Sequence, residues 1–316
     1  MKLLALVCCI PFVVSGQQAS PTAVKPRLIF QSGFEGSTRL QSIRPQFDQI
    51  VGVDSSLRLA NNWEASFKPG FENNFAIYYE GGDSSQRSAS IIPEKGNPKN
   101  HVLYYRLAEA AAKGNSKARI QANLYNGAGV KELFQSEMVM FGEGFKTLSS
   151  YEKSFNWLTI SEWWNNKVWG NAPDQFRIKL NVVKLDPAPG TPLYFSLSSQ
   201  TYDPATKKFD DIWTAVNTNV AVPVGEWVKI DQYFKEGDNQ NGRFYVAIST
   251  QKDKTTVLFD VRKATYDIRA KNPDGLKDYN PLKLYTSKDV VDFLKNKGQT
   301  LEIYWDNLEI WENKQP

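Results

Sequence analysis

Hydrophobic and polar residues alternate along residues 225–248 and predict two β-strands joined by a polar turn. In the first half, the polar positions that share one face are Trp227, Lys229, Asp231 and Tyr233. A period of two places these side chains on one side of a strand and the apolar ones on the other. Residues 236–242 hold the Gly, Asp and Asn residues that are typical of turns. Such a hairpin belongs to a sheet with one dry face and one wet face.

Three further segments, 118–125, 176–183 and 193–201, show the same alternation. Their polar positions are Arg119, Gln121, Asn123 and Tyr125, then Arg177, Lys179 and Asn181, then Tyr194, Ser196, Ser198 and Gln200. Residues 287–297 form the one segment with a convincing helical pattern, and Ser287 is its candidate N-cap. Many half-wet strands and few helices predict an all-β fold, an antiparallel β-jelly-roll sandwich with one short helix near the C-terminus.

The first residues have the pattern of a secretory signal. In residues 1–16, Lys2 precedes an apolar run that ends in small residues, and the run is too short to span a bilayer. Residues 17–26 are predicted to be a flexible leader, and residues 27–316 a single β domain. Cys8 and Cys9 are the only cysteines and lie within the signal, so the mature chain has no thiol chemistry. We therefore expect a secreted or periplasmic protein with no membrane span.

The charge balance limits the partners. The formal net charge of +4 is small, and no run of Lys or Arg accompanies it. These features argue against nucleic acid and weakly favour an acidic polymer. We see no sequence motif for an organic cofactor, and the sequence does not indicate an oligomeric state.

Two carboxylates near the chain ends form a candidate calcium site. Glu35 lies in an N-terminal turn and Asp306 in the last predicted strand. Chain ends often meet in a sandwich, and hard cations such as Ca²⁺ take several oxygen ligands. The surrounding residues resemble those of carbohydrate-binding jelly rolls, in which such a site is structural. The alternative is that Glu35 caps a turn and Asp306 makes a local hydrogen bond.

A second resemblance rests on the hairpin. Its sequence Tyr233-Phe234-Lys235-Glu236-Gly237, followed by Asn239-Gln240, is close to the Tyr-Phe-Lys-x-Gly-x-Tyr-x-Gln signature of alginate lyases. Over residues 27–311 the chain resembles the jelly-roll, concanavalin A-like polysaccharide lyases of the alginate, glucuronan and heparin lyase type. It departs from the alginate type in two places. Gln121 stands where an Arg-x-Glu strand has its glutamate, and no Gln-x-His strand exists, because His101 is the sole histidine.

The resemblance implies β-elimination on a uronic acid in an acidic polysaccharide. A donor must stabilise the enolate charge, and a base must remove the C5 proton. The first candidate for the base is Tyr233, with Tyr125 and Tyr194 as alternates. The candidate neutralisers are Arg119, Gln121, Asn123 and Arg177. Lys179 or Lys229 is expected to lower the pKa of the tyrosine. The residues expected to bind substrate are Asn123, Tyr194, Gln200, Lys229, Trp163 and Trp164.

The tryptophans and the acidic residues add to the hypothesis of a sugar-binding groove. Two adjacent residues of a strand face opposite ways, so at least one of Trp163 and Trp164 is expected near solvent, lining a groove. No carboxylate pair with the spacing of a glycoside hydrolase is present. The main alternative is a non-catalytic glycan-binding protein that uses the same face. Both hypotheses require the polar side chains to project from a single β-surface.

Overall fold

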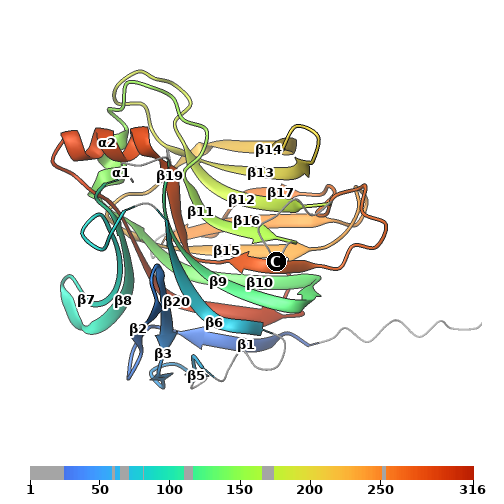
Figure 1. Cartoon of the computed structure of the whole chain (residues 1–316), viewed down its shortest axis with the longest axis horizontal. Coiled ribbons are helices and arrows are strands. Elements are labelled where there is room, and N and C mark those ends of the chain that lie inside the picture. Colours follow the sequence, from blue (N-terminus) through green and yellow to red (C-terminus); the bar gives the residue numbers. More distant parts are fainter. Residues whose placement is uncertain are drawn as a thin grey trace, which may run out of the picture.

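The computed structural model describes residues 25–58, 61–64, 71–80, 82–109, 117–165, 174–250 and 254–316. The predicted signal, residues 1–16, and most of the predicted leader lie outside this part. The fold is an antiparallel β-jelly-roll sandwich, and its two sheets overlap as two layers in Figure 1. The sequence prediction of an all-β fold is confirmed.

We call the first layer sheet A. It contains eight strands. In spatial order these are β17 (Thr256–Val261), β16 (Arg243–Thr250), β15 (Trp227–Lys235), β10 (Glu132–Phe141), β20 (Leu301–Glu312), β8 (Asn97–Leu107) and β7 (Arg87–Glu94), with β1 (Arg27–Ser32) paired to β20. The hairpin expected in residues 225–248 is the antiparallel pair β15 and β16.

We call the second layer sheet B. It contains ten strands. In spatial order these are β14 (Lys208–Ala221), β13 (Tyr194–Asp203), β12 (Phe176–Val183), β11 (Thr159–Trp164), β18 (Leu276–Asn280), β9 (Lys117–Val130), β6 (Phe71–Glu80), β3 (Phe47–Val51) and β2 (Arg39–Arg44). The short strand β19 (Lys283–Ser287) bridges β11 and β9. A separate small ladder joins β4 (Val53–Asp54) to β5 (Asn61–Asn62).

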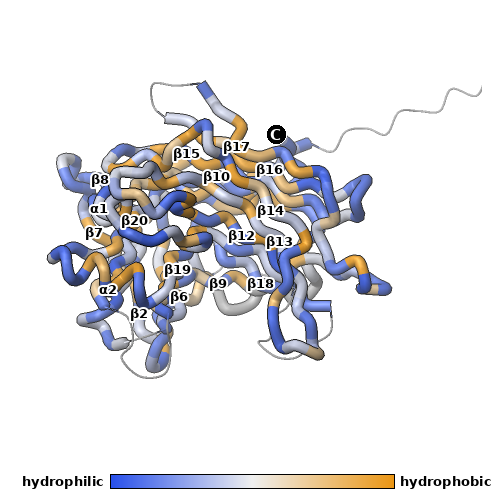
Figure 2. Tube along the Cα trace, turned by 90° about the horizontal axis from the view of Figure 1, so that it is seen from above, coloured by the Kyte–Doolittle hydropathy of each residue, from blue (hydrophilic) through white to orange (hydrophobic). Residues whose placement is uncertain are grey.

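The core lies between the sheets and follows from the alternation. In β12, Ile178, Leu180 and Val182 are fully buried and point inwards. Trp163 of sheet B packs 5.9 Å and 5.5 Å, ring centre to ring centre, from Phe234 and Phe244 of sheet A. Burial of each such side chain contributes about 1.5–3 kcal/mol to stability. Hydrophobic residues follow the strands and hydrophilic ones follow the outer loops in Figure 2.

Two helices lie together at one corner of the sandwich (Figure 1). They are α1 (Glu143–Leu148) and α2 (Lys288–Asn296). The second confirms the predicted C-terminal helix, with Ser287 at its N-cap and Val290, Val291 and Leu294 buried. The first was not expected from the sequence. No helix in the described part of the chain is long and apolar enough to cross a membrane.

Candidate functional site

The outer face of sheet B carries polar side chains that are almost completely buried. Along β9, Arg119 Nη1 donates to Gln121 Oε1 at 3.3 Å, and Gln121 Nε2 donates to Asn123 Oδ1 at 2.6 Å. Asn280 of β18 donates to the same Asn123 oxygen at 2.9 Å. Residues that point outwards would ordinarily be solvated, so their burial shows that they pack against one another.

Glu162 is the centre of a charged cluster on this face. It accepts a hydrogen bond from Lys283 and another from Arg177 Nη1 at 3.1 Å. Burial opposes ionisation of Glu162, but Lys283 and Arg177 outweigh it and lower the pKa to about 2. The pKa of the neighbouring carboxyl group of Asp278 is raised, chiefly by burial. The cluster therefore combines fixed cations with a carboxylate that stays ionised.

A hollow of about 590 Å³ adjoins this cluster over β12, β13 and β14; we call it the groove hollow. Its polar lining includes Lys179, Ser196, Ser198, Gln200, Asp211 and Thr214. Among the described residues, none forms a hydrogen bond or ion pair with the Lys179 ammonium. Burial, followed by the nearby Arg177 charge, lowers the pKa of Lys179 to about 7. A substantial fraction of this amine is thus neutral and able to accept a proton at neutral pH.

Two aromatic rings lie between the groove hollow and the cations Arg119 of β9 and Lys283 of β19. Trp157 lines the hollow, and its ring lies 4.9 Å from the ring of Tyr285 on β19. The Tyr285 ring in turn lies 4.8 Å from the Arg119 guanidinium and 5.2 Å from the Lys283 ammonium. Flat rings flanked by cations suit the faces and acidic groups of a sugar.

Most of the polar residues predicted from the sequence share this face. Strand pairing aligns Glu162 with Lys179 and Arg177 with Gln200, while Tyr194 lies at the far end of β13 beside Val183. Gln200 accepts a hydrogen bond from Arg177 Nε at 2.9 Å and donates to Asp211 at 2.8 Å. The predicted residues brought to this face are Arg119, Gln121, Asn123, Arg177, Lys179, Tyr194 and Gln200. The side chain of the alternate candidate Tyr125 lies outside the described part.

Tyr233 and Lys229 lie on the other sheet, so their predicted place in the groove is wrong. In β15, Gln232 and Phe234 point into the core, and the alternation turns Tyr233 and Lys229 to the outer face of sheet A. Tyr233 donates a hydrogen bond to Glu132 at 2.7 Å. Burial, with the Glu132 carboxylate, raises the pKa of Tyr233 and so disfavours the phenolate that a base would need.

The two adjacent tryptophans also differ from expectation. Trp163 is 0% exposed in the core, and Trp164 is 2% exposed although it points outwards. The Trp164 ring packs 5.9 Å from Phe209, and the Arg177 guanidinium lies 5.5 Å from it. The prediction that one of the pair is near solvent is wrong, because neighbouring side chains cover the outward ring.

Glu162, Lys283, Tyr285 and Asn280 are the members of the site that the sequence did not indicate. Lys283 and Tyr285 are two residues apart in β19, so the only sequence pattern that could have indicated them is a short alternation of outward and inward residues. Residues 262–280 are polar and contain Pro and Gly, a composition typical of a loop, yet Leu276–Asn280 form β18. No local pattern indicates Glu162, because its partners Arg177 and Lys283 come from β12 and β19.

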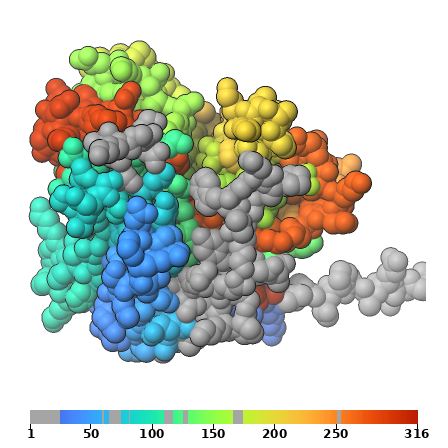
Figure 3. Space-filling view, in the orientation of Figure 1, coloured from blue at the N-terminus to red at the C-terminus, as the bar shows by residue number. Residues whose placement is uncertain are grey.

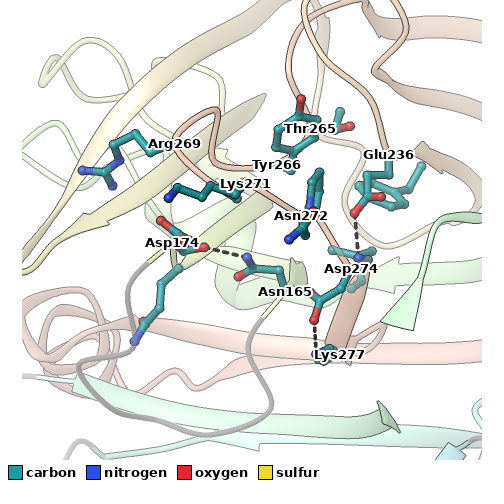
Figure 4. A pocket seen from close by; sticks show the side chains of 16 residues that line it. Asn165, Asp174, Glu236, Thr265, Tyr266, Arg269, Lys271, Asn272, Asp274 and Lys277 are labelled. Atoms are coloured by element: carbon teal, nitrogen blue, oxygen red, sulfur yellow. Dashed lines mark hydrogen bonds and ion pairs between the residues drawn. The ribbon is translucent and has the colours of Figure 1, made fainter. Parts of the chain in front are cut away.

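A larger hollow of about 660 Å³ lies beyond the end of β18 (Figure 4). Several of its polar groups bind one another. Asn165 donates to the backbone carbonyl of Asp174 at 2.6 Å, and Glu236 accepts from the backbone N–H of Gly275 at 2.6 Å. Lys277 pairs with Asp274. These groups are already satisfied, so we place the candidate site in the groove hollow, where Lys179 has no such partner.

The predicted calcium ligands lie near one another at the opposite side of the fold. Glu35 accepts from the backbone N–H of His101 and lies 2.8 Å from its Nδ1, while Asp306 accepts from Asn100 at 3.0 Å. Burial, with the charges of Glu35 and Glu94, raises the pKa of Asp306 to about 7. The described residues contain no group of three or more His, Cys, Asp or Glu side chains arranged to hold a metal ion. Calcium binding therefore stays a prediction.

No protein-family model matches the sequence. No curated protein matches it either. Solved structures similar to this chain include alginate lyase Aly36B, with 15% identity, a TM-score of 0.45, and coverage of 73% of this chain and 85% of that one. The endo-β-1,4-glucuronan lyase from Trichoderma reesei has 14% identity, a TM-score of 0.44, and coverage of 74% and 89%. The PL-14 alginate lyase from Aplysia kurodai has 10% identity, a TM-score of 0.46, and coverage of 78% and 91%. Jelly-roll polysaccharide lyases, the class named by the sequence resemblance, are thus also among the similar structures.

Proposed function

We propose that this protein is a lyase-like, carbohydrate-active protein that cleaves a uronic-acid-containing polysaccharide by β-elimination in the groove hollow. The observation that carries the proposal is the Lys179 amine. It lines an open hollow, no described residue binds its ammonium, and its pKa is lowered to about 7. A general base works best when its pKa lies near the working pH.

The reaction assigns one step to each group. The neutral Lys179 amine takes the C5 proton of the uronate, the C4–C5 double bond forms, and the bond from C4 to the glycosidic oxygen breaks. The resulting ammonium then returns its proton to the leaving oxygen, so that the side chain ends in its starting state. Negative charge builds on the carboxylate side of the sugar during proton removal and is stabilised by nearby cations. Arg177 and Lys283 both pair with Glu162, which strand pairing aligns with Lys179, so these two cations are assigned this role.

The cations on this face favour an acidic polymer over a neutral one. Arg119, Arg177, Lys179 and Lys283 lie on β9, β12 and β19 of sheet B. Three of them pair with the carboxylates Glu80 and Glu162. Trp157 and Tyr285 supply ring surfaces for sugars beside them. The rows of side chains run across the strands, so a polymer lying across sheet B would meet the aromatic and cationic groups in succession.

One observation favours the non-catalytic alternative. Arg119, Arg177 and Lys283 each already pair with a carboxylate of the chain. Their charge is therefore partly balanced before any substrate arrives, which suits holding a uronate more than stabilising an enolate. A glycan-binding protein would use the same face without the elimination step.

An absorbance assay separates the two functions. The C4–C5 double bond absorbs ultraviolet light, so the purified protein is mixed with polymers of mannuronate and guluronate, of glucuronate and of galacturonate. The expected result is a rise in absorbance with at least one polymer. No rise with any of them, combined with retarded migration of the protein in gels containing a polymer, would establish the binder instead.

We also propose that the protein is exported. The proposal rests on the charge, apolar run and small residues of residues 1–16, and on the confinement of both cysteines to that segment. Expression with this segment followed by N-terminal sequencing of the product is expected to show cleavage close to residue 16. Retention of Met1 on protein from the cell exterior would contradict cleavage.

A further inference from the structure

A third hollow lies where the edges of the two sheets meet, away from the groove hollow. It has a volume of about 330 Å³, and we call it the seam hollow. Strands β2 and β3 of sheet B line one side of the hollow, and the start of β7 of sheet A lines the other. In Figure 3 the blue N-terminal residues lie directly beside the cyan residues that come later in the chain. Its polar lining includes Ser42, Arg44, Asp48, Ser84, Arg87 and Ser88.

Arg87 is the unusual member of this lining. It is only 6% exposed, and its buried Nε has no hydrogen-bond partner. Across the described part of the chain, no acceptor forms a hydrogen bond or ion pair with its guanidinium group. Its one ring contact is with Tyr79, whose centre lies 5.0 Å from the guanidinium carbon. Burying an unpaired charge costs several kcal/mol, so this group is expected to have a partner that the polypeptide does not supply.

The other polar groups of the seam hollow include the carboxylates Asp48 and Asp83, whose charges act on Arg87, and serine hydroxyls that can donate hydrogen bonds. Asp48 accepts a hydrogen bond from Tyr79, and Asp83 accepts from the backbone N–H and hydroxyl of Ser85. These carboxylates therefore already have donors of their own. The hydroxyls of Ser42, Ser84 and Ser88 form no side-chain hydrogen bond within the described residues. Burial lowers the pKa of Arg87, yet guanidinium groups stay protonated at any physiological pH.

We propose that the seam hollow binds a small oxyanion, a carboxylate or a sulfate group, through the Arg87 guanidinium and the surrounding serine hydroxyls. The planar guanidinium presents parallel N–H donors that match two oxygens of such a group. The acid group can belong to a sugar or be a free inorganic ion. The site lies at the sheet edge opposite β12–β14, so it does not depend on the reaction proposed for the groove hollow.

The test measures the thermal unfolding midpoint at constant ionic strength in sodium chloride, sodium sulfate or sodium glucuronate. A ligand that binds the folded state raises the midpoint in a saturable way, and we expect a rise of about 3 °C. A rise with both anions indicates a site for any oxyanion, and a rise with glucuronate alone indicates one for a sugar acid. Sulfate also strengthens folding non-specifically, without saturation.

Arg87→Met separates these effects because it keeps the length of the side chain and removes the charge. The saturable rise should disappear in this variant and persist in Arg27→Met, which removes a surface arginine paired with Glu312. An equal saturable rise in Arg87→Met and the wild type would overturn the proposal. Calorimetric titration of the wild type with each anion provides a check that needs no variant, and an absence of binding heat and of any midpoint shift would overturn it as well.

Discussion

The outer faces of the two sheets show a similar alternation of polar residues, but they differ in how deeply these residues are buried and in how their charges interact. On sheet B, Arg119, Gln121 and Lys283 are 5%, 2% and 0% exposed, and the charges of Arg119 and Lys283 act on one another. On sheet A, Arg243 pairs locally with Asp260 at 2.7 Å, and the Lys229 side chain is 43% exposed. Solvent screens isolated pairs such as these, while crowded and dry charges shift one another's pKa.

The contrast shows that an alternating polar pattern identifies the outward face of a strand but not the exposure or the pKa of the side chains on it. Lys179 and Lys229 occupy comparable positions, each pointing outwards from a strand between polar neighbours. The pKa of Lys179 is lowered to about 7, and Lys229 has the Asp231 carboxylate 3.2 Å away as a hydrogen-bond partner. The face to which we assign the proposed reaction is the one where burial and like charges together lower the pKa of an amine.

The largest expected effect comes from removing that amine. Lys179→Met should lower kcat/KM by about 10²-fold or more, because general-base catalysis contributes 10²–10⁴-fold. Formation of the unsaturated product is the measurement. Lys229→Met on sheet A is the matched control and should change the rate by less than about twofold. Equal losses of kcat/KM in the two variants would contradict the assignment of the reaction to sheet B.

Neutralising the centre of the charged cluster should destabilise the fold strongly. Glu162→Gln leaves Lys283 and Arg177 without their carboxylate and should cost about 3–5 kcal/mol of unfolding free energy. Because the folded pKa of Glu162 is about 2, below its ordinary value of 4.5, its contribution exists above pH 4.5 and is lost as the pH falls towards 2. Urea unfolding of both proteins at neutral and acidic pH should therefore show the difference narrowing with acid. Glu132→Gln on sheet A provides the control, with less than about 1 kcal/mol lost.

The pH profile sharpens the role of Lys179. A base must be unprotonated, so kcat/KM should rise about tenfold per pH unit below pH 7 and level off above it. The profile is measured on the wild type with one polymer at fixed ionic strength. A rate that falls as the pH rises through 7 would show that the protonated amine is required instead.

Removing an aromatic ring from the groove hollow should weaken binding more than chemistry. Trp157→Ala is expected to raise KM about tenfold, since a sugar–ring contact is worth roughly 1 kcal/mol or somewhat more, and to leave kcat nearly unchanged. Trp227→Ala removes a partly exposed tryptophan on sheet A, whose indole N–H binds Glu94, and should leave KM unchanged. A large fall in kcat for Trp157→Ala would instead place that ring in the chemical step.

The smallest effect is expected for the tyrosine that the sequence favoured. Tyr233→Phe loses the hydrogen bond to Glu132 and should cost about 1 kcal/mol of stability. Its rate should match the wild type, because the side chain lies on sheet A. Loss of activity in this variant, with the fold retained, would show that Tyr233 takes part in the reaction after all.

The sequence predicted the fold and one face of sheet B well because both depend on local periodicity. Arg119, Gln121 and Asn123 occupy alternate positions of one strand, so their shared face follows from the chain itself. The assignment of Tyr233 to that face did not follow, since a period of two identifies an outward face and leaves open which sheet the strand joins.

The rest of the site depends on contacts between distant segments. Lys283 meets Glu162 across 121 residues of sequence, and both lie on strands whose short length gave little pattern. Trp164 is the outward-pointing member of the tryptophan pair, but Phe209 and Arg177 cover it. The free amine of Lys179 likewise results from packing that no local alternation encodes.

The position of β20 has a consequence for biosynthesis. This strand comes last in the chain yet lies between β10 and β8 in the middle of sheet A. Until residues 301–312 leave the ribosome, β10 and β8 have no partner on that side and half of the layer cannot close. Sheet A therefore cannot close before Leu301–Glu312 are available, and nascent chains stalled upstream of Leu301 should remain susceptible to proteases and to chaperone capture.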